Sequence, residues 1–115
     1  SLEETWKQKN AAIFVAKTKE GMAGYLIFYY VLEEGEIARI ATAHSVRRQG
    51  AASQMFRKLL DFCREQKITR IMLEVRENNE AARQFYGKCG FTKDGIRRNY
   101  YENPKENAVL MSVNL

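Results

Sequence analysis

The feature that most constrains the fold of this chain is a change in the spacing of its apolar residues at Gly50. After this glycine, apolar side chains recur with the spacing that lines one face of an α-helix. This stripe consists of Ala52, Met55, Phe56, Leu59, Leu60 and Cys63. Before Gly50, the apolar and aromatic residues instead form short runs typical of β-strands. The chain therefore combines strands with an amphipathic helix that is predicted to end near residue 66.

Turn residues divide the rest of the chain into further strands and helices. The predicted strands cover residues 12–17, 22–31, 36–42, 69–75, 91–98 and 108–113, and helices are predicted over residues 1–9 and 79–89. Gly90 is placed to end the second of these helices. The predicted fold class is α+β, with a mixed, mostly antiparallel sheet and flanking helices in one domain over residues 1–115.

Composition limits the classes of protein to which the chain can belong. Of its 115 residues, 45% are hydrophobic and 29% are charged, which is typical of a globular domain. The absence of an apolar run of about 20 residues argues against a membrane-spanning helix. Two cysteines without a pairing pattern, and a start unlike a signal peptide, predict a reduced, cytoplasmic protein.

Positive charge is concentrated in the second part of the chain. Residues 1–46 carry 5 basic and 6 acidic side chains, whereas residues 47–115 carry 14 basic and 8 acidic ones. Such an excess favours an anionic partner, which on composition alone could be nucleic acid, a phosphorylated cofactor or an acidic protein.

The segment Arg47-Arg48-Gln49-Gly50-Ala51-Ala52-Ser53 lies where the predicted helix begins. Free N–H groups and the positive end of the helix dipole make such a start a binding place for phosphate oxygens, and adjacent arginines add charged hydrogen bonds. Neither a Walker-type loop nor a dinucleotide fingerprint occurs. On these residues alone, a solvated helix start is an equally good interpretation.

The same segment resembles the Q/R-x-x-G-x-G/A signature of the GNAT superfamily of acetyl-CoA-dependent N-acetyltransferases. The resemblance extends over nearly the whole chain, through Leu73-Glu74-Val75-Arg76-x-x-Asn79, Phe85-Tyr86-x-x-Cys89-Gly90-Phe91 and Arg97-Arg98-Asn99-Tyr100-Tyr101. This combination is similar to the RimI-type branch, the ribosomal-protein alanine N-acetyltransferases. A GNAT fold agrees with the mixed sheet predicted above.

The resemblance implies a role for each matching residue. Acetyl-CoA as cosubstrate would contact Ile40, Ala41, Thr42, Arg47, Arg48, Gln49, Gly50, Ala51, Ala52, Ser53 and Asn79. Glu74 would be the general base that accepts a proton from the substrate amine, and Tyr86 the general acid for the leaving thiolate. Arg98, Tyr100 and Tyr101 would bind the acceptor. No metal ion is implied, and the single histidine, His44, reads as a polar loop residue.

The implied reaction is transfer of an acetyl group to a primary amine, most simply the N-terminal α-amino group of a ribosomal or other protein. Two alternatives stay open. The acceptor could be a small amine or a lysine side chain, or the chain could be a non-catalytic module that binds CoA or another protein.

Individual residues also have structural interpretations. Glu74 could form an ion pair with Arg70 or Arg76, and Tyr86 could be a core aromatic residue. The basic and aromatic residues 97–101 could stack on RNA bases, although no RNP1-type motif is present, so nucleic-acid binding is disfavoured. Cys63 and Cys89 read as buried helix residues rather than as reactive thiols.

The chain departs from the GNAT pattern in two respects. The strand and helix with which the family usually begins are missing from this sequence. Either the sequence is a fragment of a longer chain, or it is a reduced family member whose uncovered sheet edge would favour homo-oligomers. Asn107 stands where an aspartate is common, and it lacks the charge that could attract a substrate ammonium group.

Overall fold

The computed structural model describes residues 9–43 and 50–115. The chain divides into two compact units, Ser1–Thr69 and Arg70–Leu115, which are described separately below. The predicted helix over residues 1–9 lies almost wholly outside the described residues. The single-domain organisation predicted from the sequence stays a prediction.

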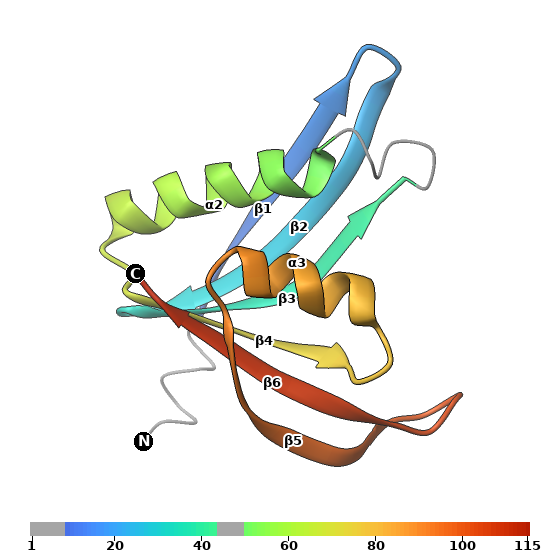
Figure 1. The fold of residues 1–115 in the computed structure, drawn as a ribbon. Helices are drawn as coiled ribbons and strands as arrows, with labels where there is room; N and C mark the ends of the chain where they lie inside the picture. The colour runs from blue at the N-terminus through green and yellow to red at the C-terminus, as the bar shows by residue number, and fades with distance from the viewer. Residues whose placement is uncertain (1–8, 44–49) are drawn as a thin grey trace. The chain divides into compact units, whose positions relative to one another are not determined.

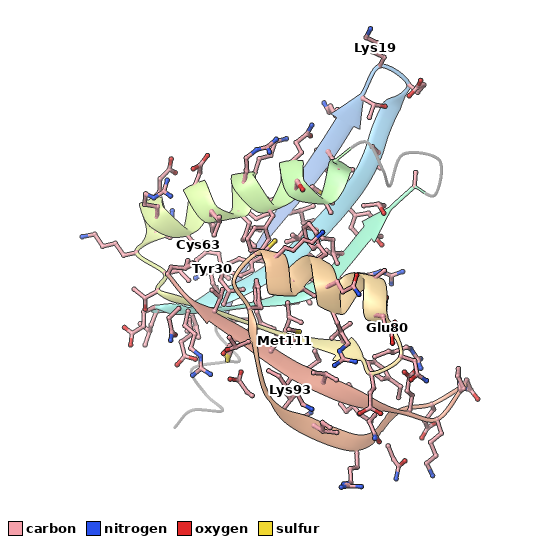
Figure 2. The ribbon with its side chains drawn as sticks, in the orientation of Figure 1. Lys19, Tyr30, Cys63, Glu80, Lys93 and Met111 are labelled. Atoms are coloured by element: carbon pink, nitrogen blue, oxygen red, sulfur yellow. The ribbon has the colours of Figure 1, made fainter. Side chains whose placement is uncertain are left out.

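The described part of the first unit is a three-stranded antiparallel meander with one helix. Its strands are β1 (Asn10–Thr18), β2 (Gly21–Val31) and β3 (Glu34–Thr42), and its helix is α2 (Ala51–Gln66). Lys19 lies at the tip of the β1–β2 turn and points away from the strands (Figure 2). The three strands predicted from the sequence are confirmed, with ends that differ by at most two residues.

Helix α2 packs on one face of this meander (Figure 1). Its buried side chains are Ala51, Met55, Phe56, Leu59 and Cys63, close to the predicted stripe. Ala51, rather than the predicted Ala52, starts the buried face. Phe62 contacts Phe14 and Tyr30 edge to face, with ring centroids 5.4 and 5.2 Å apart. All three rings are half-buried, and edge-to-face contacts of this kind stabilise the packing of α2 on the strands.

The second unit has the strand order β4-β6-β5. It contains β4 (Arg70–Arg76), α3 (Glu80–Lys88), β5 (Thr92–Tyr101) and β6 (Glu106–Asn114), and β6 pairs antiparallel with both neighbours. Burial alternates along β4, where Ile71, Leu73 and Val75 are buried and the residues between them are half-buried. Glu74 therefore lies on the face opposite Leu73 and Val75, as its place in the strand predicts.

Both ends of α3 follow from local sequence. The Asn79 side chain accepts a hydrogen bond from the Ala82 N–H at 3.2 Å and caps the first turn. At the other end Gly90 has a φ of 97°, and the Phe91 N–H donates to the Tyr86 carbonyl at 3.0 Å. Gly90 thus ends the helix as predicted, since glycine adopts this left-handed conformation without strain.

Two expectations need correction or restriction. Cys89 is half-buried at the end of α3, whereas Cys63 is fully buried as predicted.

Within the described residues no helix is long and apolar enough to cross a membrane. The cytoplasmic location stays a prediction.

Candidate active site

The first unit contains all the described residues of the predicted acetyl-CoA site except Asn79, which lies in the second unit. Ile40, Ala41 and Thr42 are the last residues of β3, and all three are half-buried. They pair with Leu26, Tyr25 and Gly24 of β2, so the main-chain groups on one edge of β3 are hydrogen-bonded to β2. Beyond β3, the predicted residues Arg47, Arg48 and Gln49, and also His44, lie outside the described residues.

Helix α2 begins directly after Gly50, which has φ 78° and ψ 21°. Residues with a Cβ atom adopt this left-handed conformation at a cost in free energy. Among residues 9–43 and 50–115, no atom would crowd a Cβ at this position. Within the described part of the chain no side chain caps the helix start, and the first turn contains no acidic residue. Ala51 is buried, Ala52 half-buried and Ser53 exposed. A helix start of this kind suits an anionic group such as a pyrophosphate.

In the second unit, Glu74 is 30% exposed and pairs with Arg97 of β5, at 3.5 Å between Oε1 and Nη1. The alternative that Glu74 pairs with Arg70 or Arg76 is wrong, because these arginines have other partners. Arg97 reaches Glu74 across β6, where the residue opposite Arg97 is the small Ala108. The guanidinium stabilises the negative charge of the carboxylate.

Tyr101 is the residue that connects Glu74 electrostatically with Tyr86. Burial, and then the nearby Glu74 carboxylate, raise the pKa of Tyr101, while Arg76 opposes this effect. Tyr101 also contributes to the raised pKa of Tyr86. Glu74, Tyr101 and Tyr86, three of the predicted site residues, are thus linked through the electrostatic effects of Glu74 on Tyr101 and of Tyr101 on Tyr86.

Tyr86 is only 5% exposed, and its ring packs against Phe91 with the centroids 5.6 Å apart. Burial raises the pKa of Tyr86 to about 12, with Cys89 and Tyr101 adding to the effect. The hydroxyl thus keeps its proton at neutral pH, in the form that can donate a hydrogen bond to an incoming group.

The structure also shows the contacts of two other predicted site residues, Asn79 and Tyr100. Asn79 uses its side-chain oxygen to cap α3, so its amide nitrogen is the group that could contact a cofactor. Tyr100 is 46% exposed, and its ring contacts Tyr101 at 5.1 Å between centroids. The Arg97 guanidinium lies 4.9 Å from the Tyr100 ring centroid, a cation–π contact.

Arg98 and Tyr100 belong to a bulge in β5 that the sequence did not reveal. Residues 98–100 face only Asn107 of β6, because the register shifts between the regular pairs at Arg97 and Tyr101. We refer to residues 98–100 as the β5 bulge. It explains why β5 continues to Tyr101, beyond the predicted end at residue 98, since a bulge interrupts the alternation of a strand.

Arg76 organises the turn between β5 and β6. Its guanidinium stacks 4.3 Å from the Tyr101 ring centroid and donates to Glu106 Oε1 at 3.2 Å. It also donates to the carbonyl groups of Pro104 and Glu102. This network holds the Tyr101 ring against Arg76, and sequence reasoning missed it because its members lie in separate segments.

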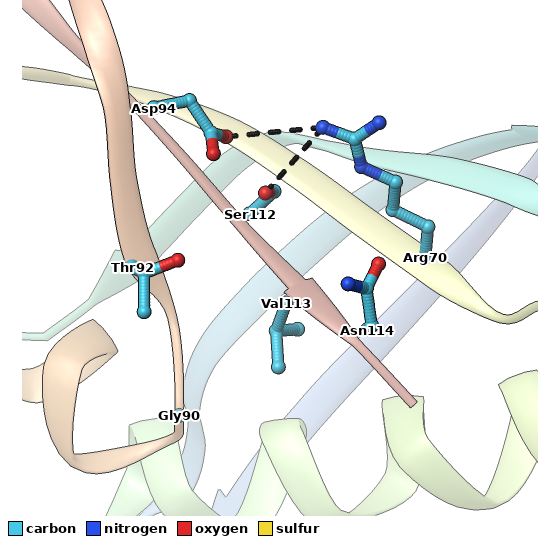
Figure 3. A pocket seen from close by; sticks show the side chains of 7 residues that line it. All are labelled: Arg70, Gly90, Thr92, Asp94, Ser112, Val113 and Asn114. Atoms are coloured by element: carbon cyan, nitrogen blue, oxygen red, sulfur yellow. Dashed lines mark hydrogen bonds and ion pairs between the residues drawn. The ribbon is translucent and has the colours of Figure 1, made fainter.

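A polar hollow of about 520 Å³ opens elsewhere on the second unit (Figure 3). It is lined by Arg70, Gly90, Thr92, Asp94, Ser112, Val113 and Asn114. Arg70 lies 3.9 Å from Asp94 and donates to the Ser112 hydroxyl at 3.5 Å. None of the predicted site residues lines this hollow.

The two thiols have environments that disfavour nucleophilic chemistry. Burial raises the pKa of Cys63 to about 11, and burial also raises the pKa of Cys89. Both are therefore protonated at neutral pH, and a thiol is a much weaker nucleophile than a thiolate. Within residues 9–43 and 50–115, no His, Cys, Asp and Glu side chains gather in a group that could hold a metal ion.

Comparison with known proteins identifies the class of protein. Residues 1–91 match the model of the acetyltransferase (GNAT) family, and the chain belongs to this family. It is an acetyltransferase with the GNAT fold, as the resemblance implied.

Individual relatives narrow the comparison to one branch. A candidate [ribosomal protein bS18]-alanine N-acetyltransferase of Bacillus subtilis is 34% identical over 105 residues, which cover 90% of this chain and 70% of that protein. The crystal structure of the ribosomal-protein-S18-alanine N-acetyltransferase from Escherichia coli is 31% identical, covers 90% of this chain and 68% of that one, and superposes with a TM-score of 0.84. The chain is thus similar to RimI-type enzymes.

One solved structure of the same fold contains the acetyl donor. A GNAT family acetyltransferase from Elizabethkingia anophelis, determined with acetyl-CoA bound, is 20% identical to this chain with a TM-score of 0.79. The match covers 99% of this chain and 81% of that one.

Proposed function

We propose that this protein transfers the acetyl group of acetyl-CoA to the N-terminal α-amino group of a protein, with the alanine N-terminus of ribosomal protein bS18 as the first candidate acceptor. The observation that carries the proposal is the 34% identity to a bS18-alanine N-acetyltransferase candidate across 90% of the chain. The setting of Glu74, Tyr86 and Tyr101 in the second unit supports the same chemistry.

In this mechanism Glu74 is the general base. It accepts a proton from the substrate ammonium, through a water molecule, and the neutral amine attacks the thioester carbonyl carbon. A new C–N bond forms and the C–S bond breaks, so the electron pair leaves with the CoA sulfur. The nitrogen then loses its second proton to water, which gives the neutral amide, and the CoA thiolate takes up a proton from water. The partial exposure of Glu74 supports this role, because a base must be reachable by water.

Tyr86 supports departure of the thiolate. A thiol such as that of CoA resembles cysteine, with a pKa of about 8.5, whereas the pKa of Tyr86 is about 12. Complete proton transfer from the resting phenol to the thiolate is therefore unfavourable. The role that fits this difference is a hydrogen bond donated to the sulfur as its negative charge develops, which is the kind of electrostatic stabilisation that lowers barriers most.

The first unit is proposed to hold acetyl-CoA. Backbone groups of Ile40, Ala41 and Thr42 would pair with the pantetheine arm like an added strand, and an N–H near Thr42 would stabilise the oxyanion. Residues 48–53 would bind the pyrophosphate, a role supported by the left-handed Gly50 and by a first turn without acidic residues. Asn79 is the cofactor contact proposed in the second unit.

The direct experiment is mass spectrometry of a peptide library incubated with the protein and acetyl-CoA. We expect one added acetyl group on peptides with a free N-terminal alanine and none on the same peptides blocked at the N-terminus. Acetylation confined to lysine side chains or to small amines would replace the proposed acceptor. Acetyl-CoA binding, measured as a rise in Tm, without any transfer would instead indicate a binding module.

Tyr86→Phe separates chemistry from binding. We expect kcat to fall by about tenfold or more with little change in the Kd for acetyl-CoA, because only the transition state needs the hydroxyl. A variant as active as the wild type would remove Tyr86 from the mechanism.

A further inference from the structure

The β5 bulge, which carries the proposed acceptor residues Arg98 and Tyr100, has little main-chain support of its own. Its central residue, Asn99, has a φ of 51°, in the left-handed region. Because residues 98–100 share a single opposite residue on β6, the ladder of main-chain hydrogen bonds is interrupted there. Something other than regular strand pairing must therefore hold the bulge in its observed conformation.

The side chain of Asn107 provides this support. Its Oδ1 accepts a hydrogen bond from the Asn99 N–H at 2.9 Å. Its Nδ2 donates to Glu77 Oε1 at 3.4 Å. The main-chain carbonyl of Asn107 also accepts from the Glu77 N–H at 3.0 Å. One half-buried amide thus links the middle of the bulge to the turn that follows β4.

Glu77 continues this connection to the helix that bears Tyr86. The Arg83 guanidinium, on α3, donates to the Glu77 carbonyl at 2.8 Å. The sequence of contacts therefore runs from Asn99 through Asn107 and Glu77 to Arg83. A displacement of the Asn107 side chain would release the bulge from this turn, while the buried sheet residues beneath it would stay in place.

We propose that Asn107 is a positioning residue for the acceptor: it fixes the β5 bulge to the β4–α3 turn, so that acceptor binding depends on its side-chain amide and acetyl-CoA binding does not. This inference rests on the proposed N-terminal acetyltransferase function. The amide is required because the side chain must accept a hydrogen bond from Asn99 and donate one to Glu77, and an amide can do both. An aspartate would keep the first contact but oppose the Glu77 carboxylate.

The first test follows the hydrogen bond itself and needs no activity. In amide hydrogen exchange by NMR, the Asn99 N–H of the wild-type protein should exchange slowly for a residue in an exposed bulge. Asn107→Ala should accelerate this exchange by about tenfold, while amides at the centre of β6 keep their rates. An Asn99 exchange rate that does not change in this variant overturns the proposed support.

The second test exchanges donor and acceptor between the two side chains. Asn107→Asp should raise the KM for an alanine peptide by about threefold to tenfold and leave the KM for acetyl-CoA unchanged. Glu77→Gln alone should be close to the wild type, because the new amide oxygen still accepts from Asn107. When both substitutions are combined, the new amide at position 77 can donate to the new carboxylate at position 107. The KM of this double variant for the peptide should therefore return towards the wild-type value.

Asn114→Asp is the matched control, since it makes the same substitution at an exposed position near the end of β6. It should leave both KM values unchanged. The proposal is overturned if the double variant is no better than Asn107→Asp, or if acetyl-CoA binding weakens as much as peptide binding. If the wild-type protein acetylates no peptide, the proposed function fails, and the exchange experiment still decides whether Asn107 holds the bulge.

Discussion

The carboxylate of Glu74 on β4 forms an ion pair with the guanidinium of Arg97 on β5, across the intervening strand β6. Arg97 is also in cation–π contact with Tyr100, so it touches both the proposed base and a proposed acceptor residue. Because Arg97 is 54% exposed, solvent screens the pair, and its main consequence is orientation rather than stability.

Glu74→Gln should lower kcat for peptide acetylation by about a hundredfold, the usual size of a general-base effect. The Gln side chain keeps the shape of Glu but cannot accept a proton at neutral pH. Asp94→Asn is the matched control, because it removes a carboxylate from another partly exposed ion pair of the same three strands. Steady-state kinetics should show a loss only in the first variant. Equal rates for Glu74→Gln and the wild type would remove Glu74 from the reaction.

Burial of Tyr86 predicts a loss of stability at high pH. The phenol has a pKa of 10.0 in model compounds and about 12 in the folded protein. Between these values the unfolded chain loses the proton and the folded protein keeps it, so rising pH favours unfolding. Below the pKa of the unfolded chain the contribution of Tyr86 to the free energy of unfolding is fully present. This contribution should fall by about 3 kcal/mol as the pH rises to the pKa of the folded protein.

Urea denaturation at neutral pH and at a pH between these two pKa values measures this effect. Tyr86→Phe should lose less stability than the wild type between the two conditions, because a Phe side chain has no proton to release. Parallel losses in both proteins would contradict the raised pKa of Tyr86.

Gly50→Ala should destabilise the protein by about 1–2 kcal/mol, because a residue with a Cβ is strained at a φ of 78°. Gly87→Ala is the opposite case, since Gly87 lies inside α3 with open space around it. That control should stabilise the protein by about 0.5–1 kcal/mol. Thermal unfolding with and without acetyl-CoA checks both variants, and a Gly50→Ala protein as stable as the wild type would refute the strain argument.

Arg76→Lys should destabilise the second unit by about 1–2 kcal/mol. A lysine has no planar guanidinium that could stack on the Tyr101 ring. Its single ammonium group also cannot make all the hydrogen bonds that Arg76 donates to the Glu106 carboxylate and the Pro104 carbonyl. Arg64→Lys makes the same change in a largely exposed ion pair with Asp61 and should alter stability by less than about 0.5 kcal/mol. Similar denaturation midpoints for the two variants would show that the Arg76 network adds nothing beyond its charge.

The helices and strands could be predicted because each has a regular period of apolar residues. The stripe of α2 and the alternation of β4 place Met55, Leu59 and Glu74 on the observed faces without knowledge of other segments. The Asn79 cap also follows from the position of an asparagine directly before α3. These features depend on residues near each other in sequence.

Contacts across the sheet could not be predicted in this way. Pairing of Glu74 with Arg97 requires the strand order β4-β6-β5 and the register of both pairings, which no single strand encodes. The β5 bulge is hidden for a related reason, because residues 98–101 are polar or aromatic and show no alternation that extra residues would disturb. The roles of Asn107, Glu77 and Arg76 follow only from that register.

The position of β6 between β4 and β5 also has a consequence for synthesis on the ribosome. The strands and helix of the first unit are complete in the nascent chain once Thr69 has been added. β4 is made next, but its partner in the second unit is β6, which follows both α3 and β5 in the chain. Cotranslational folding of the second unit is therefore delayed until β6 has been translated, and the stage with an exposed strand edge is the one at which aggregation competes with folding.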